Sequence, residues 1–488
     1  MNSMKLLNIF LTTSMLLSFS ACSSDNSENE PDKPNQENPN KPADTKSVAE
    51  RNTERSIAII NAAMENYFEG QEMKMARKYN PYTGSRSSEV GSVWMYTSAI
   101  EAVNATMKAM KELKDSGKPA LYDANWNTYK TLLGNLVENL EYYAGTFSLT
   151  SYTGTNSWTV YAVNRASSKG TADVTGVLNV YDDQEWLVRE LVEAYLITDN
   201  ADYLKKAEYL ASYVLDGWDC TLDANGNENG GITWGPGYGT KHSCSNGPMI
   251  SPLVWLSDIY KGKGDQITYK IIQPDKKRVE VTENKSDYYL KMAGKIYDWQ
   301  KSTLYNASEG VYYDMLGADN NIHYEEIDGV RYRINNPVTG ATGNYYSYNT
   351  GTMLSGAAAL AEATGNADYA ADVKSLTTTS FNHFAKLGSI LSGYYSFDLT
   401  GFSPWFNGVL MRAYAEAYGQ NPAAAECLKA FQTNLDYGYA NFLEKDMLPV
   451  NLLSGWNRDR SKNDTEAMFT FVNAAEYAVL ASHELKKN

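Results

Sequence analysis

The sequence predicts an all-α protein built from six helical hairpins, with one small β-hairpin inserted among them. Apolar residues recur at helical spacing in about twelve segments, which begin near residues 47, 90, 123, 182, 200, 246, 286, 345, 366, 403, 421 and 462. The hairpin also repeats, because EAYLITDNADYLKKAEYL at 193–210 is echoed at 359–376 and more faintly at 413–431. A repeated helical hairpin in a chain of this length forms either an open solenoid or a closed toroid.

The first 46 residues are expected to lie outside the folded body. Residues 1–21 carry one basic residue, Lys5, followed by the apolar run LLNIFLTTSMLLSFSA, which is typical of a secretory signal peptide. The residues before Cys22 are similar to a bacterial lipobox, with Phe19 in place of the usual Leu, and this similarity predicts that Cys22 is lipidated. Residues 22–46 are polar and lack aromatic residues, which predicts a disordered tether.

The tether also bears on localisation. The acidic stretch directly after Cys22 resembles the export signal of Bacteroidetes-type surface lipoproteins. It predicts an outer membrane lipoprotein exposed on the cell surface, with a periplasm-facing protein or an ordinary linker as alternatives. We expect the lipid anchor to be the sole membrane contact, because a net charge of −15 disfavours both anionic membrane surfaces and nucleic acid.

The folded body is expected to span residues 47–488 as a single domain. The segment that starts at Asp182 illustrates its helical pattern. Its apolar face holds Leu187, Leu191, Ala194 and Tyr195, and its charged residues Glu185, Arg189 and Glu193 stand four apart and can pair. Residues 265–285 break the helical period, because they alternate and are β-branched about a Pro274-Asp275 turn. We expect them to form a β-hairpin outside the helical ring.

Composition excludes some classes of protein. With 43% hydrophobic residues, the chain is neither wholly disordered nor collagen-like, nor a small disulfide-stapled domain. Its aromatic residues are mostly tyrosine, 37 Tyr against 13 Phe, with 10 Trp in addition. Tyr and Trp combine a flat apolar face with a polar tip, which suits a carbohydrate ligand. A tyrosine-rich helical core explains the same composition equally well.

Cysteine and histidine give no sign of a metal or a cofactor, and we expect neither. With Cys22 assigned to lipid, Cys220 and Cys244 flank a Gly-rich loop and could pair there. Cys427 is expected in the core. The four histidines, at 242, 323, 383 and 483, show no ligand spacing.

The most informative residues are Asp182 and Asp183, where a loop enters a helix. Acidic residues at a helix start often only satisfy free backbone N–H groups and the helix dipole. Two adjacent carboxyl groups can also supply the nucleophile and the acid/base of a retaining glycosidase, if they lie roughly 5 to 5.5 Å apart and their pKa values differ. The spacing permits this chemistry without requiring it.

A Gly-rich loop at 228–247 adds a possible platform for a sugar. Its adjacent glycines allow a backbone to approach a ligand or to fold tightly beneath an aromatic ring, and Trp234 and Tyr238 follow at once. A loop anchored by a buried Trp is the alternative. Further aromatic and polar clusters stand at hairpin entrances: Trp94, Tyr312 to Asp314, Tyr345 to Asn349, and Phe402 to Phe406. In a toroid these loops would meet at one end.

These residues, in order, resemble the landmarks of glycoside hydrolase family 76. The matching positions are Tyr181-Asp182-Asp183, Gly230-Gly231-Ile232 with Trp234, Ser245-Asn246-Gly247, Tyr348-Asn349 with Gly351, and Phe406 with Gly408. The resemblance covers about residues 90 to 480, and its most specific part is the Asp-Asp element. Thr233 and Asn407 depart from the pattern, because many members have Trp and Lys there.

The resemblance implies an (α/α)6 toroid that hydrolyses α-1,6-linked mannan backbones inside the chain, with retention. It implies that Asp182 is the nucleophile and Asp183 the acid/base, and that Asp314 contacts substrate. Substrate-binding roles are also expected for Trp94, Trp234, Tyr238, Asn246, Tyr348 and Asn349. The expected partner is α-mannan or a manno-oligosaccharide, bound by a monomer.

Two other functions are compatible with parts of the sequence. A non-catalytic, surface glycan-binding lipoprotein would share the helices, the aromatic residues and the tether, but it needs no carboxylate pair. An (α/α)6 enzyme that acts on an acidic polysaccharide should have a basic site, and the landmark loops hold few Lys or Arg.

Overall fold

The computed structural model describes residues 46–319 and 321–487, and its compact body runs from Lys46 to Asn488. The expected signal peptide at 1–21, Cys22 and nearly all of the expected tether at 22–46 lie outside the described residues. Within the described part, no helix is both long and apolar enough to cross a membrane.

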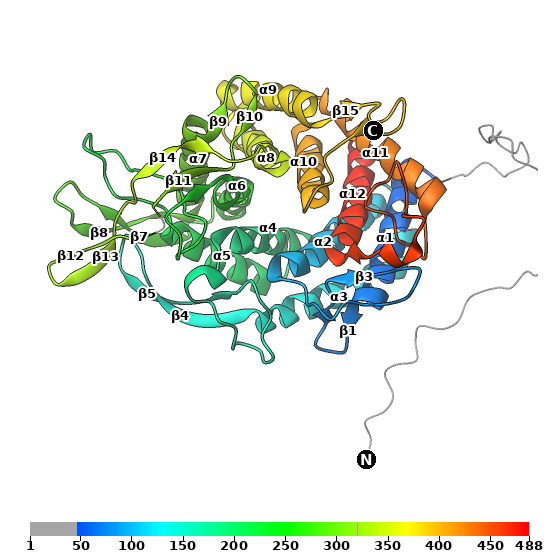
Figure 1. The fold of residues 1–488 in the computed structure, drawn as a ribbon. Coiled ribbons are helices and arrows are strands. Elements are labelled where there is room, and N and C mark those ends of the chain that lie inside the picture. The colour runs from blue at the N-terminus through cyan, green and yellow to red at the C-terminus, as the bar shows by residue number, and fades with distance from the viewer. Residues whose placement is uncertain (1–45, 320, 488) are drawn as a thin grey trace, which may run out of the picture. The chain divides into compact units, whose positions relative to one another are not determined.

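Six helices form a closed inner ring (Figure 1). Each packs against the next in the order α2, α4, α6, α8, α10, α12, and α12 packs against α2. Their bounds are Val93–Asp115, Tyr181–Thr198, Gly247–Tyr260, Ser347–Thr364, Ser403–Ala417 and Ala467–Lys486. Because the last helix returns to the first, the fold is a toroid, and the open solenoid is excluded.

Six further helices surround this ring, each packed against one or two inner helices. They are α1 (Val48–Tyr67), α3 (Ala120–Asn139), α5 (Ala201–Asp216), α7 (Lys285–Leu304), α9 (Ala367–Phe384) and α11 (Ala424–Phe442). The expected (α/α)6 arrangement is therefore confirmed, and each helix begins within about five residues of its predicted start.

The repeated turn explains why the inner and outer helices alternate so regularly. Asp199 and Gly365 end α4 and α8 in the left-handed conformation, with φ of 58° and 67°. The next residue caps the outer helix that follows: Asn200 Oδ1 accepts from Asp202 N at 3.1 Å, and Asn366 Oδ1 accepts from Asp368 N at 2.9 Å. Each pair reverses the chain within two residues.

Small residues let the inner helices approach closely. A Cβ on Gly351 of α8 would lie 2.9 Å from Leu410 Cα of α10, and a Cβ on Gly356 would lie 2.8 Å from Ile250 of α6. Both glycines therefore allow α8 to pack tightly between its two neighbours.

The expected β-hairpin is present as β7 (Gln266–Ile272) and β8 (Arg278–Asn284), which pair from Gln266↔Asn284 to Ile272↔Arg278. It packs on the outer helix α7 and extends away from the ring, as expected (Figure 1).

The structure contains more β-structure than the sequence analysis expected. A second hairpin is formed by β4 (Ala144–Thr150) and β5 (Thr155–Tyr161), and a third by β12 (Tyr324–Ile327) and β13 (Val330–Arg333). A three-stranded sheet has the order β14 (Val338–Thr342), β11 (Met315–Ala318), β6 (Lys241–His242). The remaining pairs are two-residue strands: β1 (Phe68–Glu69) with β2 (Lys74–Met75), β3 (Lys78–Tyr79) with β17 (Thr465–Glu466), β9 (Tyr305–Asn306) with β10 (Val311–Tyr312), and β15 (Lys386–Leu387) with β16 (Tyr395–Ser396).

Glu185, Arg189 and Glu193 of α4 do not form ion pairs with one another, so that part of the sequence prediction is wrong. Arg189 binds Glu416 of α10, Glu193 lies 3.7 Å from Lys108 of α2, and Glu185 has no ion-pair partner among the described residues. The reason is that α4 belongs to the inner ring and is buried on nearly all sides, so its charged side chains reach neighbouring helices.

The three cysteines of the body, Cys220, Cys244 and Cys427, are buried and free, so the possible Cys220–Cys244 pair is not formed.

Candidate active site

The first turns of the inner helices meet at one end of the ring. Trp94 of α2 lies 4.8 Å from Phe402, which directly precedes α10, measured between ring centroids. Trp186 of α4 lies 4.8 Å from Trp405 of α10, and Tyr348 of α8 stacks on Phe406 of α10 at 4.3 Å. The expected convergence of the aromatic loops is therefore present. Helix N-termini carry partial positive charge, so this end of the ring favours carboxylates and electron-rich ligands.

Asp182 and Asp183 occupy the first turn of α4 at this end. The N-cap residue is Val180, which has no side-chain cap, so neither aspartate fills the capping position. Asp182 Oδ1 accepts from the backbone N–H of Asp183 at 3.0 Å, and its Oδ2 accepts from the indole Nε1 of Trp234 at 3.3 Å. Asp183 is 6% exposed, and its carboxyl group has no hydrogen bond within the described chain. The free N–H groups of the first turn thus account for one oxygen of Asp182 and for neither oxygen of Asp183.

The two carboxyl groups have different proton affinities. Burial raises the pKa of Asp182 to about 6, and hydrogen bonds from Trp234 and Cys244 limit the rise. Burial and the neighbouring charge of Asp182 raise the pKa of Asp183 well above its ordinary range. Asp182 therefore loses its proton at a lower pH than Asp183, so the pair favours a carboxylate on Asp182 and a proton on Asp183.

A third carboxyl group, that of Glu185, lies deeper in the ring. It is fully buried, and neither of its oxygens has a hydrogen-bond partner. Burial and the charge of Asp182 raise the pKa of Glu185 well above the ordinary value, which favours its neutral form. In the sequence, Glu185 stands out only as part of a helical charge pattern.

The Gly-rich loop positions Trp234 beside Asp182. Gly230 and Gly231 have φ of 70° and 77°, and a Cβ on Gly231 would lie 2.3 Å from the indole ring of Trp299. These glycines therefore fold beneath an aromatic ring, which is one of the two interpretations of the sequence. Beyond them, the backbone N–H of Tyr181 donates to the carbonyl of Trp234 at 2.8 Å, which joins the loop to the start of α4.

Two buried polar groups hold this loop rigid. Lys241 Nζ lies 2.8 Å from Asp219 Oδ2 and 2.5 Å from the carbonyl of Gly230. Asn246 is fully buried, and its amide exchanges hydrogen bonds with the backbone N–H and C=O of Ile232 at 2.8 and 2.9 Å. Asn246 was expected to bind substrate, but its amide is committed to the loop, so it can influence a ligand only through that loop.

Trp234 belongs to a small aromatic group. It stacks on His242 at 5.0 Å and lies 4.7 Å from Tyr238. Burial lowers the pKa of His242 to about 4, so its ring is neutral and stacks as an apolar surface. The spacing of the four histidines does not predict this position, and the only sequence signal for it is that His242 lies in the landmark loop.

Asp314 reaches the site through the three-stranded sheet. It directly precedes β11, which pairs with β6, and its carbonyl accepts from Ser243 N at 2.8 Å. Its side chain is half-buried, and burial raises its pKa while the nearby amide of Asn349 opposes the rise. Asn349 itself is fully buried in the first turn of α8. The sheet thus brings a residue from outside the inner ring to the same end.

The structure gathers most of the predicted site residues into three groups. Asp182, Asp183, Trp234 and Tyr238 form one, Trp94 and Tyr348 join the aromatic side chains of α10, and Asp314 lies by Asn349. Within the described part of the chain, no group of His, Cys, Asp and Glu could hold a metal ion.

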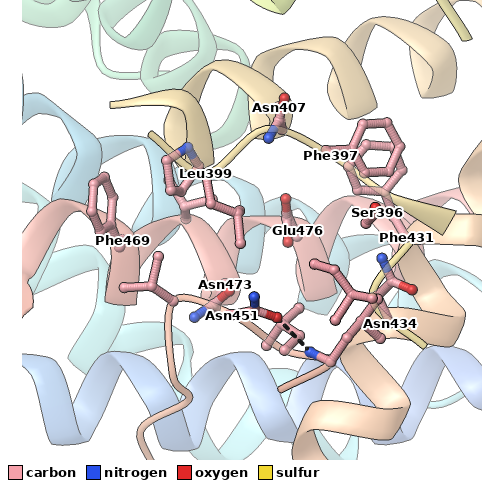
Figure 2. Close-up of a pocket in the computed structure, with 16 residues that line it drawn as sticks. Ser396, Phe397, Leu399, Asn407, Phe431, Asn434, Asn451, Phe469, Asn473 and Glu476 are labelled. Carbon is pink, nitrogen blue, oxygen red and sulfur yellow. Dashed lines mark hydrogen bonds between the residues drawn. The ribbon is translucent and has the colours of Figure 1, made fainter. Parts of the chain in front are cut away.

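A cavity of about 70 Å³ lies between α10, α11 and α12 (Figure 2). Asn407, one of the two departures from the family pattern, lines this cavity. Its side-chain amide is hydrogen-bonded outside the cavity: Oδ1 accepts from Ser347 Oγ at 2.8 Å, and Nδ2 donates to the carbonyl of Asp398 at 2.7 Å. Glu476 also points into this cavity, and burial together with the charge of Glu101 raises its pKa to about 8. Asn407 therefore ties the starts of α8 and α10 together.

Comparison with known proteins agrees with this architecture. Residues 279–478 match the model of Glycosyl hydrolase family 76, whereas a search of curated proteins finds no match. The matched region holds Asp314 and the α8 and α10 landmarks, and it begins after the Asp182-Asp183 pair.

Solved structures share the fold. A glycoside hydrolase family 76 mannosidase, Bt3792 from Bacteroides thetaiotaomicron, is 19% identical with a TM-score of 0.65, covering 90% of this chain and 100% of that one. An inactive variant of the α-1,6-mannanase GH76A of Salegentibacter, in complex with α-1,6-mannotriose, is 16% identical with a TM-score of 0.57, covering 88% and 99%. Dfg5 from Chaetomium thermophilum, in complex with glucosamine, is 16% identical with a TM-score of 0.53, covering 90% and 92%. The fold that the sequence resemblance implies is therefore confirmed, and the family model matches the part of the chain from residue 279 to residue 478.

Proposed function

We propose that this chain cleaves α-1,6-linked mannan backbones internally and with retention of configuration, a proposal supported by the match of residues 279–478 to the model of Glycosyl hydrolase family 76. One observation carries the proposal: two adjacent carboxyl groups, at the end of the ring that gathers the aromatic side chains, differ in proton affinity. In the Salegentibacter α-1,6-mannanase, the inactive variant carries substitutions at two consecutive aspartates, which supports assigning the chemistry to Asp182 and Asp183.

The proposed first step uses both protonation states. The Asp182 carboxylate attacks the anomeric carbon, while Asp183 gives its proton to the departing glycosidic oxygen. The carbon–oxygen bond to the leaving sugar breaks, and an ester forms between Asp182 and the remaining mannosyl unit. The indole N–H of Trp234, 3.3 Å from Asp182 Oδ2, fixes the orientation of the attacking carboxylate.

The second step reverses the roles of proton donor and acceptor. Asp183, now ionised, removes a proton from water, and the water oxygen attacks the same anomeric carbon and releases Asp182. Each displacement inverts the carbon, so the product retains its α configuration. Asp183 regains its proton and Asp182 its charge, which restores the starting state.

The proposed substrate is a neutral polymer. The site has half-buried aromatic faces at Trp94, Trp234 and Tyr238 on which a pyranose can stack. The α-1,6-mannotriose complex of the Salegentibacter enzyme supports a mannan over other neutral glycans. A glycan-binding protein without activity would use the same aromatic surfaces, and the carboxyl pair is what favours the enzyme.

The test replaces each aspartate separately and resolves the products from debranched α-1,6-mannan by size. Asp182→Asn should abolish hydrolysis of every substrate, because no leaving group replaces a missing nucleophile. Asp183→Asn should still release a good aryl leaving group, and added azide should restore turnover by replacing the base-assisted water. Asp202→Asn is the matched control, because Asp202 also lies in the first turn of a helix but is exposed.

Two results would count against the proposal. If Asp182→Asn keeps full activity, the pair has no catalytic role and the glycan-binding function is favoured. If NMR detects the β-anomer as the first product, the mechanism is inverting. Both aspartate variants should still bind mannan, since stacking does not require the carboxylates.

A lipid anchor at Cys22 is a second proposal, and it rests on the sequence alone. It would hold the enzyme at the outer membrane, with the polar residues 23–46 as the spacer between lipid and ring.

A further inference from the structure

A groove of about 290 Å³ lies on the outer side of the ring and shares no lining residue with the candidate active site. It is formed by the β4–β5 and β7–β8 hairpins together with the outer helices α5 and α7. Both hairpins lie at the left of the view in Figure 1. They meet where Arg278 Nε donates to the carbonyl of Tyr152 at 3.1 Å, so each hairpin supports the other.

Aromatic side chains line this groove. Trp158 on β5 and Tyr269 on β7 are half-buried, so each keeps part of its ring accessible. Tyr269 lies 4.7 Å from Tyr288 of α7, and Trp158 lies 5.4 Å from Tyr213 of α5, between ring centroids. The two rings are therefore held in place before any ligand binds.

Fixed polar groups accompany the rings. Asp216 Oδ1 accepts from Ser151 at 2.8 Å and from Thr153 at 3.0 Å. Lys291 Nζ donates to the hydroxyl of Tyr269 at 2.7 Å. Rigid aromatic faces beside oriented hydrogen-bonding groups are the combination that a pyranose requires, with its C–H face and its rim of hydroxyls.

The charges in the groove are balanced. Its acidic residues are Asp216, Glu228 and Glu280, and its basic residues are Lys270, Lys291 and Lys295. Two of these charges pair with each other, because Lys295 Nζ lies 2.9 Å from Glu228 Oε1, and Lys291 pairs with Glu283 of β8 beside the groove. A charged ligand would have to compete with these pairs, whereas a neutral one would not.

The neighbouring cavity shows that volume alone does not make such a site. It is larger, about 580 Å³, and lies between the 221–229 loop and the tip of the β7–β8 hairpin. None of its lining residues is aromatic. The volume of the groove is close to the lower limit for small-ligand pockets, about 300 Å³. Unlike the larger cavity, the groove also has aromatic side chains on which a sugar can stack.

We propose that this groove is a second carbohydrate-binding site, which holds a neutral pyranosyl segment of the same polymer that the active site cleaves. The proposal rests on the proposed function for the identity of the polymer. A second contact on one long chain raises the effective concentration of that chain at the active site, and a short oligosaccharide gains nothing from it. The groove should therefore distinguish long substrates from short ones.

The test compares Tyr269→Ala with the matched control Tyr324→Ala, which removes an exposed tyrosine from the β12–β13 hairpin outside the groove. Kinetics are measured for the full chain on long debranched mannan and on a short manno-oligosaccharide. Tyr269→Ala should raise KM for the long substrate roughly 3- to 10-fold with kcat unchanged, and leave the short substrate unaffected. The control should change neither. Asn156→Ala trims only an exposed groove amide and should produce a smaller change in the same direction.

The second measurement is independent of catalysis. Mobility in gels that contain mannan is measured for Tyr269→Ala and Tyr324→Ala, each combined with Asp182→Asn. The groove variant should be retarded less than the control variant. If both groove variants match the control on long mannan, or if they lose activity equally on long and short substrates, the proposal is wrong. If the wild type does not cleave mannan but Tyr269→Ala is still retarded less than the control in a gel that contains a neutral glycan, the proposed function is wrong and the groove is still a carbohydrate-binding site.

Discussion

Replacing Gly231 by alanine is expected to destabilise the protein and to disturb the site. Gly231 has φ of 77°, a conformation that costs an L-residue roughly 1 to 2 kcal/mol. The new Cβ would also lie 2.3 Å from the Trp299 ring, so the indole or the loop must move, and such overpacking costs roughly 1 to 3 kcal/mol. The sum, about 2 to 5 kcal/mol, is a large part of the stability of a typical domain.

Gly226→Ala is a matched control for this substitution. Gly226 lies in the same loop region with φ of 84°, but a Cβ added there would have no neighbouring atom within 4 Å. Gly226→Ala should lower the free energy of unfolding only by the cost of the left-handed backbone conformation, roughly 1 to 2 kcal/mol. The difference between the two variants therefore isolates the contact with Trp299.

The assay is urea unfolding followed by tryptophan fluorescence, together with kcat on mannan. Gly231→Ala should lower the midpoint more than Gly226→Ala at equal slope, and it should lower kcat because the shifted backbone moves Trp234 away from Asp182. Equal midpoints for the two variants would show that the loop does not fold tightly beneath the Trp299 ring. An unchanged kcat in Gly231→Ala would show that this loop does not position Trp234.

Three further outcomes are expected. In a pH series, kcat/KM should fall about tenfold per pH unit below about 6, where Asp182 becomes protonated, and a flat profile would contradict its role as nucleophile. The pKa of Glu476 is near 4.5 in the unfolded chain and about 8 in the folded protein. The free energy of unfolding should therefore fall by roughly 1.4 kcal/mol per pH unit as the pH rises between these two values. Glu476→Gln should remove this pH dependence. If the wild-type urea midpoint is the same at pH 5 and pH 7.5, as it should be in Glu476→Gln, the prediction is wrong. Cys22→Ala should turn a detergent-extractable membrane protein into a soluble one, and identical fractionation would contradict lipidation.

The helices could be predicted from the sequence because their signals are local. Apolar spacing and the Asp199-Asn200 and Gly365-Asn366 turns act over a few residues, and the structure places the helices where those signals are. Closure of the ring was different: it depends on α12 packing against α2, and no local pattern distinguishes this from a solenoid.

The missed strands divide into two kinds. The β4–β5 hairpin had a readable signal, because residues 144–161 are rich in Thr and Ser and alternate about a turn at 151–154. The β14–β11–β6 sheet had none, since β6 and β11 are two to four residues long and lie more than seventy positions apart in the sequence. That second kind matters more for the candidate site, because the β14–β11–β6 sheet positions Asp314 beside it.

The proposed division of roles between the two aspartates depends on tertiary structure. In the sequence, Asp182 and Asp183 are neighbours of the same type at one helix start, and nothing local separates their pKa values. The difference arises because Trp234, fifty-two positions away, donates to Asp182 alone, while Asp183 is buried without a hydrogen bond beside a charged neighbour. Trp234 in turn depends on glycines packed under Trp299 and on the buried Asn246 amide. The residues that make the pair asymmetric are therefore loop-packing residues, which explains why local sequence patterns identify the carboxyl groups more readily than they distinguish their roles.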